Sequence, residues 1–313
     1  MQVLVTGATG AIGTLLVPRL LAAGHRVRCM VRDPQRLSAP WRSEVELVVG
    51  AVEPAQSAFR AADGCDVTYY LVHGMEAGLR DLVTRERAQA RAFREGAEAA
   101  GVRRIVYLGG LVDEAALGTV SSHLYARHQT GVALREGGVP VTEVRAGIVL
   151  GASSASFRLL EAAARTGLAL DTSWTRSRTQ PIAADDLLSV LLRVLDDPWA
   201  ERRVLEVAGP EVLSYRELVG RVRARLERRD AIRVSITGLP PEVVAGGAAA
   251  AAGIDARLAL SLLQSARVDT VVTDDAACEH YASLLATPTD LAIADALREV
   301  AAARQGRSRG VRP

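Results

Sequence analysis

Three glycines near the N-terminus have the spacing that a phosphate-binding turn requires. Gly7, Gly10 and Gly13 follow an apolar run at residues 1–5, and apolar residues recur at helical spacing after them. Such a turn uses one glycine for its sharp bend, one for close approach of a pyrophosphate, and one for packing of the helix on the strand. The amide groups at the helix N-terminus then face the phosphates.

We therefore predict a dinucleotide-binding loop. An ordinary glycine turn is the alternative, but the strand before the glycines and the helix after them favour the binding loop. The residues of this loop that we expect to contact the cofactor are Gly7, Thr9, Gly10, Ala11, Ile12 and Gly13.

The residue that closes the second predicted strand bears on which dinucleotide is bound. Arg32 stands there, followed by Asp33. Proteins that prefer NAD place an acidic side chain at this point to accept hydrogen bonds from the adenosine ribose, whereas a guanidinium suits a 2′-phosphate. We predict NADP(H) rather than NAD(H), with Arg36 as a second positive contact. A solvated arginine at a strand end is the alternative.

Further candidate contacts lie where the fourth and fifth predicted strands end. Leu71, Val72 and His73 close the fourth strand, and Gly109 lies at the end of the fifth. In a parallel sheet these ends share one edge with the glycine loop, so we expect all four residues near the cofactor. The end of the fourth strand, with His73, is expected over the adenine and ribose. A surface loop is the more common place for a histidine such as His73.

The elements that position these residues alternate along the chain. Strands are predicted at residues 1–5, 25–31, 45–50, 66–73, 104–110 and 140–145. Helices are predicted between them, among others at residues 54–62, 79–100 and 121–137. This alternation predicts an α/β fold with a Rossmann-type, doubly wound parallel sheet and helices on both faces.

From Gly147 the pattern changes, which predicts a smaller, mainly helical C-terminal substrate region. Residues 148–154 are expected to form a loop, and Ser214 with Glu217 a capping box. The expected domains are a Rossmann domain at 1–150, to which 180–207 return, a substrate region at 151–179 and 208–303, and a disordered basic tail at 304–313.

Composition narrows the classes of partner. The chain has 313 residues, a net charge of +2, and 38 basic residues that are all arginine, without lysine or asparagine. A net charge this close to zero argues against nucleic acid or a membrane as the main partner. No signal peptide is expected before the first strand. We expect a cytoplasmic protein with a small-molecule substrate, and a homo-oligomer is allowed. No metal site is expected from the cysteines, which are odd in number and widely spaced: Cys29, Cys65 and Cys278.

Several motifs together resemble the extended short-chain dehydrogenase/reductase superfamily, in particular its atypical NmrA-like members. They are TGATGAIG at 6–13, VRDPQRL at 31–37, YYLVHGM at 69–75, RIVYLGGL at 104–111, GVPVTEVRAGIVLG at 138–151, QPIAADDL at 180–187 and GPEVLSYREL at 209–218. The resemblance covers most of the chain to about residue 230. It implies an NAD(P)-binding Rossmann domain and a smaller substrate region assembled from separate segments.

The sequence departs from this family where catalysis is expected. Active members carry a Ser after the fifth strand and a Tyr-x-x-x-Lys pair on the next helix. Gly109 and Gly110 stand at the Ser position, and His123 and Arg127 at the Tyr and Lys positions. His123 is the candidate general acid. Arg127 can hold the nicotinamide ribose or a substrate carbonyl by hydrogen bonds, but Arg127 cannot pass protons, because its guanidinium stays charged. A pocket-lining role without catalysis is the alternative for His123, because a neighbouring cation favours its neutral form.

Three functions fit these residues. The first is an NADP(H)-dependent reductase of a small carbonyl or quinone-like substrate, with the proton supplied by His123 or by solvent. The second is a non-catalytic NADP(H)-binding sensor or scaffold, favoured by an intact glycine loop beside an altered catalytic set. The third retains the cofactor as a permanent redox partner for isomerisation. We favour the reductase, because the substrate region is retained in full.

Overall fold

The computed structural model describes residues 1–73, 81–228, 231–236 and 238–309. These residues divide into two compact units. Unit 1 comprises Met1–Gly110, Ser122–Arg145 and Leu188–Glu206, and unit 2 comprises Leu111–Ser121, Ala146–Leu187 and Val207–Pro313. The predicted Rossmann domain also included residues 111–121, 146–150, 180–187 and 207, which lie in unit 2.

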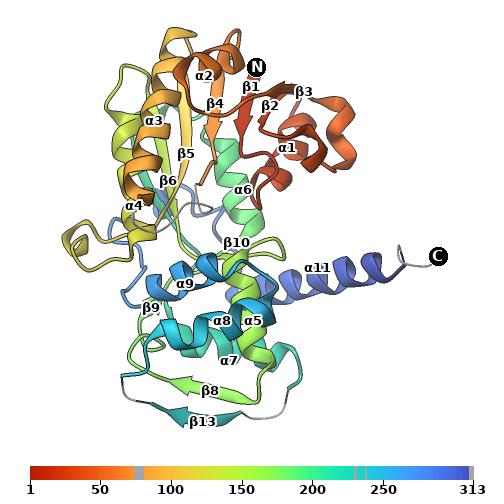
Figure 1. The fold of residues 1–313 in the computed structure, drawn as a ribbon, viewed down its shortest axis with the longest axis vertical. Helices are drawn as coiled ribbons and strands as arrows, with labels where there is room; N and C mark the ends of the chain where they lie inside the picture. Colours follow the sequence, from red (N-terminus) through yellow and green to blue (C-terminus); the bar gives the residue numbers. More distant parts are fainter. Residues whose placement is uncertain (74–80, 229–230, 237, 310–313) are drawn as a thin grey trace. The chain divides into compact units, whose positions relative to one another are not determined.

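Within the described residues, unit 1 is built on a seven-stranded sheet with the order β11-β6-β5-β4-β1-β2-β3 (Figure 1). Strand β1 pairs in parallel with β2 and β4, and the pairs β2–β3 and β4–β5 are also parallel. The strands are β1 Gln2–Thr6, β2 Arg26–Val31, β3 Glu46–Val49, β4 Val67–Tyr70, β5 Arg104–Gly110, β6 Val141–Ala146 and β11 Val204–Val207. The predicted Rossmann-type sheet is confirmed.

Helices α2 (Ala55–Ala62), α3 (Leu82–Ala99) and α4 (Ser122–Arg135) pack on one face of this sheet. The core between them contains fully buried Phe93 and Tyr70, whose rings lie 5.0 Å apart. On the other face, Tyr69 donates a hydrogen bond to the carbonyl of Leu191 in α6 (Ala184–Arg193). Helix α1 (Gly13–Ala22) follows β1 directly. The predicted helix start at residue 79 lies outside the described residues.

Unit 2 contains short strands and most of the remaining helices. Its strand pairs are β7 (Val149–Leu150) with β10 (Ile182–Ala183), β9 (Arg178–Thr179) with β12 (Leu213–Ser214), and β8 (Leu168–Asp171) with β13 (Ile232–Ser235). Its helices are α5 Ala155–Arg165, α7 Tyr215–Arg225, α8 Pro241–Ala252, α9 Ala256–Ser265, α10 Ala276–His280 and α11 Thr289–Arg309. Short 3-10 helices of unit 1 lie at Pro34–Arg36, Pro40–Glu44 and Pro198–Ala200, and one of unit 2 lies at Glu114–Ala116.

Two predictions for unit 2 need correction, and one is confirmed. The expected loop at 148–154 contains strand β7, which forms a parallel pair with β10. The expected disordered tail from residue 304 is helical as far as Arg309, because α11 continues beyond its buried face. The Ser214–Glu217 capping box is present at the start of α7, so the predicted helix boundary is confirmed there.

Candidate functional site

The glycine loop has the backbone geometry of a tight strand-to-helix turn. Gly7 has a φ of 73°, and a Cβ atom there would lie 2.7 Å from the carbonyl oxygen of Leu71. A Cβ atom on Gly13 would overlap the Gly7 carbonyl and lie 2.7 Å from the Cα of Ala8. Both positions therefore require glycine for the fold itself, independently of any ligand.

Thr6 holds this loop against the end of β4. Its hydroxyl donates to the carbonyl of Tyr69 at 3.0 Å and accepts from the amide of Leu71 at 3.3 Å. This bridge presses Leu71 against Gly7, which explains why Gly7 has no room for a side chain. Leu71 thus lies at the loop as expected, whereas the side chain of Val72 packs against the core between the sheet and α2–α4.

Gly10 differs from the other two glycines, because its outer side is open. A Cβ atom there would meet only the Gly7 carbonyl, at 3.1 Å, within 4 Å. Thr9 and Gly10 are exposed, and Ala11 and Ile12 are partly exposed at the start of α1. This open surface beside a helix N-terminus fits the pyrophosphate of a dinucleotide.

Two charged side chains follow β2, and they differ in their surroundings. Arg32 is exposed directly after the strand. The Asp33 carboxylate accepts a hydrogen bond from the amide of Gln35 at 2.9 Å and caps the 3-10 helix Pro34–Arg36. The carboxylate of Asp33 is therefore engaged in its own turn, and the side chain of Arg32 is exposed.

His73 and Arg127 are brought together from different elements. Arg127 donates from Nη1 to Nε2 of His73 at 3.1 Å and from Nη2 to the carbonyl of Leu108 at 2.9 Å. The Tyr107 hydroxyl donates to the Arg127 carbonyl at 2.8 Å. His73 therefore lies in the loop after β4, partly buried and bonded to helix α4.

His123 lies one helical turn before Arg127 and is buried, with 6% of its surface exposed. Burial and the adjacent guanidinium lower the pKa of His123 to about 3. The same two causes, with His123 as a smaller one, hold the pKa of His73 well below its ordinary value. Both imidazoles are therefore neutral near pH 7, and neither has the proton that an efficient general acid must donate.

The two glycines at the end of β5 face different neighbours. A Cβ atom on Gly109 would lie 3.3 Å from Oε1 of Glu143 and 3.4 Å from the side chain of Arg145. A Cβ atom on Gly110 would lie 3.3 Å from Nε of Arg127. A serine side chain that faces Arg127 would therefore have to come from position 110. At position 109, the missing side chain leaves room for Glu143 and Arg145.

Those charged residues belong to a buried ion-pair network that the sequence analysis missed. Arg145 donates from Nε to Oε1 of Glu143 at 2.8 Å, and Arg135 pairs with the other carboxylate oxygen. Arg145 also lies 4.0 Å from Glu206 and 3.4 Å from Nδ1 of His128. The available signal was two charges, Glu143 and Arg145, alternating with apolar residues in an interior strand.

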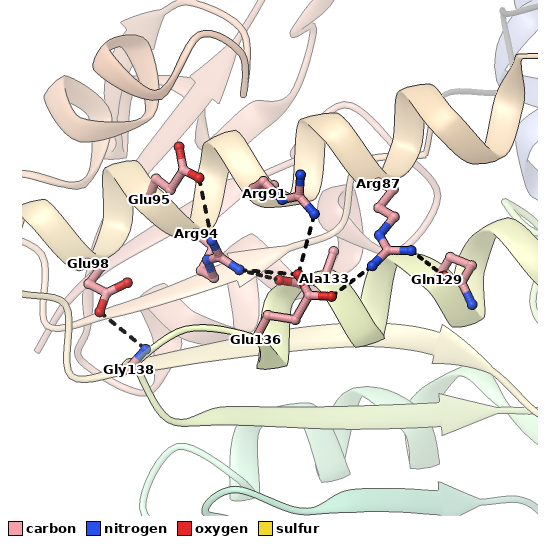
Figure 2. Close-up of polar contacts among 9 residues, drawn as sticks. All are labelled: Arg87, Arg91, Arg94, Glu95, Glu98, Gln129, Ala133, Glu136 and Gly138. Atoms are coloured by element: carbon pink, nitrogen blue, oxygen red, sulfur yellow. Dashed lines mark hydrogen bonds and ion pairs between the residues drawn. The ribbon is translucent and has the colours of Figure 1, made fainter.

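Helix α3 holds the C-terminal end of α4. Arg94 donates to the carbonyl of Ala133 at 3.1 Å, and this bond satisfies a carbonyl in the last turn of α4. Figure 2 shows three arginines of α3 that point toward Glu136, at 2.8, 3.6 and 3.6 Å: Arg87, Arg91 and Arg94. Because α4 carries His123 and Arg127, these contacts help to fix the position of the candidate site.

In unit 2, the loop around Trp174 is held by ion pairs. Arg176 pairs with Asp171 and Arg178 with Asp269, each at 2.8 Å. Both arginines therefore help to stabilise this loop through their carboxylate partners. A pocket of about 300 Å³ nearby is lined by Ser173, Trp174, Gly238, Leu239, Pro240, Pro241 and Arg267.

Two other kinds of feature, a metal site and a membrane-spanning helix, are absent from the described part of the chain. No group of three or more His, Cys, Asp or Glu side chains is placed to hold a metal ion. Within the same residues, no helix has both the length and the apolar character needed to cross a membrane.

Comparison with curated proteins gives relatives that are named as reductases. The chain is 29% identical over 245 residues to the (4-alkanoyl-5-oxo-2,5-dihydrofuran-3-yl)methyl phosphate reductase of Streptomyces griseus, covering 72% of this chain and 74% of that protein. It is 32% identical over 112 residues to a ketoreductase of Aspergillus fumigatus, covering 33% of this chain and about a third (34%) of that protein.

Solved structures share the fold. A short-chain dehydrogenase/reductase superfamily protein from Agrobacterium tumefaciens with bound NAD has a TM-score of 0.70 at 16% identity, covering 100% of both chains. The Citrobacter sp. triphenylmethane reductase complexed with NADP(H) has a TM-score of 0.72 at 18% identity, covering 95% of this chain and 100% of that one. The Escherichia coli quinone oxidoreductase QOR2 complexed with NADPH has a TM-score of 0.73 at 19% identity, covering 95% and 99%.

These likenesses confirm the predicted atypical short-chain dehydrogenase/reductase fold. A family whose description is NAD(P)H-binding matches residues 7–198, more than half of the sequence. That range includes the glycine loop, Arg32, His73 and both residues of the altered catalytic pair. The chain therefore belongs to the NAD(P)H-binding family.

Proposed function

We propose that the chain is an NADP(H)-dependent reductase of conjugated, quinone-like electrophiles. The bound nicotinamide supplies the hydride. The observation that carries the proposal is His123, a buried histidine with a pKa of about 3 at the position expected for the proton donor. A substrate suited to this site must accept hydride without a proton from that residue.

Quinone-like substrates meet this requirement. The negative charge of a reduced quinone is delocalised, and the product takes up protons from water. A simple ketone instead concentrates charge on one oxygen during hydride transfer, which calls for an acid or strong electrostatic stabilisation. Two structural neighbours, a quinone oxidoreductase and a triphenylmethane reductase, are named for conjugated substrates and support this choice.

The preference for NADP(H) rests on Arg32 and Asp33. The exposed guanidinium can pair with a 2′-phosphate, while Asp33 is engaged in capping its own turn. A hydrogen bond to a charged group contributes about 1.5–3 kcal/mol, so Arg32→Ala should weaken NADPH about tenfold or more and leave NADH binding little changed. Calorimetric titration of both cofactors tests this, and equal affinities in the parent protein would contradict it.

The second candidate function is a non-catalytic NADP(H)-binding sensor. It is supported by the same replacement of the Tyr and Lys positions by His123 and Arg127. A panel that pairs quinones with simple aliphatic ketones separates the two functions when NADPH consumption is measured. Rapid oxidation by quinones, retained in His123→Gln, supports the reductase. Faster turnover of the ketones contradicts the proposed substrate class, and tight NADPH binding without oxidation favours the sensor.

A further inference from the structure

We propose that Nδ1–H of His73 is a fixed hydrogen-bond donor to an uncharged oxygen on the nicotinamide half of the dinucleotide, and that Arg127 makes it so by fixing the tautomer of His73. The proposal rests on the dinucleotide-binding part of the proposed function. It does not require that the protein turn over a substrate.

The tautomer follows from the contact between the two side chains. A guanidinium has N–H donors and no acceptor. Because Nη1 of Arg127 lies 3.1 Å from Nε2 of His73, Nε2 must be the unprotonated, accepting nitrogen. The buried setting beside this cation keeps the ring neutral. The single proton of neutral His73 therefore resides on Nδ1.

That proton has no acceptor among the residues that the structure describes. Nδ1 of His73 is buried, and neither it nor Nε of Arg127 has a hydrogen-bond partner there. Most buried polar atoms in folded proteins are paired, because an unpaired one loses its hydrogen bond to water without a replacement. Two such donors on a pair of directly bonded side chains indicate a place that a ligand completes with acceptor atoms.

The topology indicates which part of the ligand lies there. Strand β1, which leads into the glycine loop, has β2 on one side and β4 on the other. Dinucleotides bind across this change of strand order, with the pyrophosphate at the glycine loop. Arg32 follows β2 and is placed for the adenosine half. His73 follows β4 and Leu108 lies in β5, so the His73–Arg127 pair is on the side of the nicotinamide half.

An uncharged oxygen is the acceptor that suits this donor best. The neutral Nδ1–H carries no net charge, and the positive charge of Arg127 is already shared by His73 and the Leu108 carbonyl. The hydroxyls of the nicotinamide ribose and the carboxamide oxygen of the nicotinamide have this chemistry. Both riboses of the dinucleotide carry hydroxyls, so the choice of the nicotinamide half rests on the strand order and not on the type of oxygen. The phosphates themselves are left to the glycine loop.

Two substitutions separate the roles of the ring nitrogens. Asn places its amide near the position of Nδ1, and Gln places its amide near that of Nε2, where it can still accept from Arg127. We expect His73→Gln to weaken NADPH about tenfold and His73→Asn to stay within about threefold of the parent. Affinities are measured by calorimetry without substrate. The control ligand is 2′,5′-ADP, which lacks the nicotinamide half. It should bind the parent, His73→Gln and His73→Asn proteins equally.

Nitrogen NMR of the parent protein provides the independent readout. Its His73 should show protonated Nδ1 and unprotonated Nε2, and the Nδ1–H signal should shift with NADPH but not with 2′,5′-ADP. Unchanged NADPH affinity in His73→Gln, equal weakening of 2′,5′-ADP, or a proton on Nε2 would each overturn the proposal. A protein that binds NADPH in this way but reduces nothing would disprove the reductase and leave the proposal standing.

Discussion

Nη1 of Arg127 lies 3.1 Å from Nε2 of His73, so a helix residue and a strand-end residue 54 positions apart share one hydrogen bond. The contact joins α4 to the segment after β4, next to Leu71 and the glycine loop. It also places a permanent positive charge beside two histidines, His73 and His123. Burial is the main cause that lowers the pKa of both groups, and the charge of Arg127 adds to it.

The first prediction concerns the pH dependence of turnover. Because His123 is neutral above about pH 3, the rate with a quinone should show no inflection from this residue between about pH 5 and 8. His123→Gln should give a profile of the same shape. Steady-state rates with a buffer series test this, and a rate that falls through pH 6–7 only in the parent would restore His123 as the acid.

A second prediction follows for acid stability. In the unfolded chain His123 takes up a proton below its ordinary pKa of 6.5, whereas in the folded state it does so only near pH 3. The unfolded state therefore binds more protons between these values, and stability falls as pH falls through this window. His123→Gln should remove this part of the loss, which amounts to about 3 kcal/mol by pH 4.

Urea unfolding of the parent and His123→Gln proteins from pH 7 to pH 4 measures this difference. The comparison is between slopes, because carboxylates contribute equally to both proteins. If the free energy of unfolding fell equally steeply in the two proteins, His123 would not be held neutral by the fold.

The local parts of the fold were predictable from sequence, because short-range chemistry determines them. Strand β5 has the predicted bounds of 104–110. The glycine loop could be located because Gly7 and Gly13 are required by atoms a few residues away or on the adjoining strand. Ser214 and Glu217 likewise mark the start of α7 through bonds that span three residues.

The contacts that define the candidate site could not be predicted in this way. No sequence periodicity relates His73 to Arg127, since their meeting depends on how β4 and α4 are placed by the sheet. The tail was misjudged for a different reason. Its Arg, Gly and Ser residues are typical of disorder, but α11 is anchored by buried Ile293, Ala296 and Val300, and extending an existing helix is much easier than starting one.

A third prediction tests the glycine loop. Gly10→Val should abolish dinucleotide binding, because its side chain would occupy the open surface at which a pyrophosphate would lie. The fold should persist, since only the Gly7 carbonyl lies near the new Cβ atom. Gly220→Val is the matched control, because Gly220 has no atoms within 4 Å of an added Cβ and lies in unit 2. Parental NADPH affinity in Gly10→Val would exclude the loop as the binding site.

The last prediction concerns the buried ion pairs beneath α4. Gly131 lies inside α4, and a Cβ atom there would lie 2.6 Å from Cδ and 2.7 Å from Oε1 of Glu143. Glu143 cannot move aside at low cost, because it is buried and bonded to Arg145 and Arg135. Breaking a buried ion pair costs about 3–5 kcal/mol, so Gly131→Ala should lower the free energy of unfolding by several kcal/mol despite the better helix propensity of alanine.

Gly220→Ala provides the opposite case, because Gly220 is an exposed glycine inside α7 with open space around it. At this position only the gain in helix propensity acts, so Gly220→Ala should raise the free energy of unfolding by about 0.5–1 kcal/mol. Denaturant unfolding of the two variants beside the parent measures both effects. Stabilisation by Gly131→Ala would mean that Glu143 has room to move. The ion pairs of Glu143 with Arg145 and Arg135 would then not hold its side chain in place, and the prediction would be contradicted.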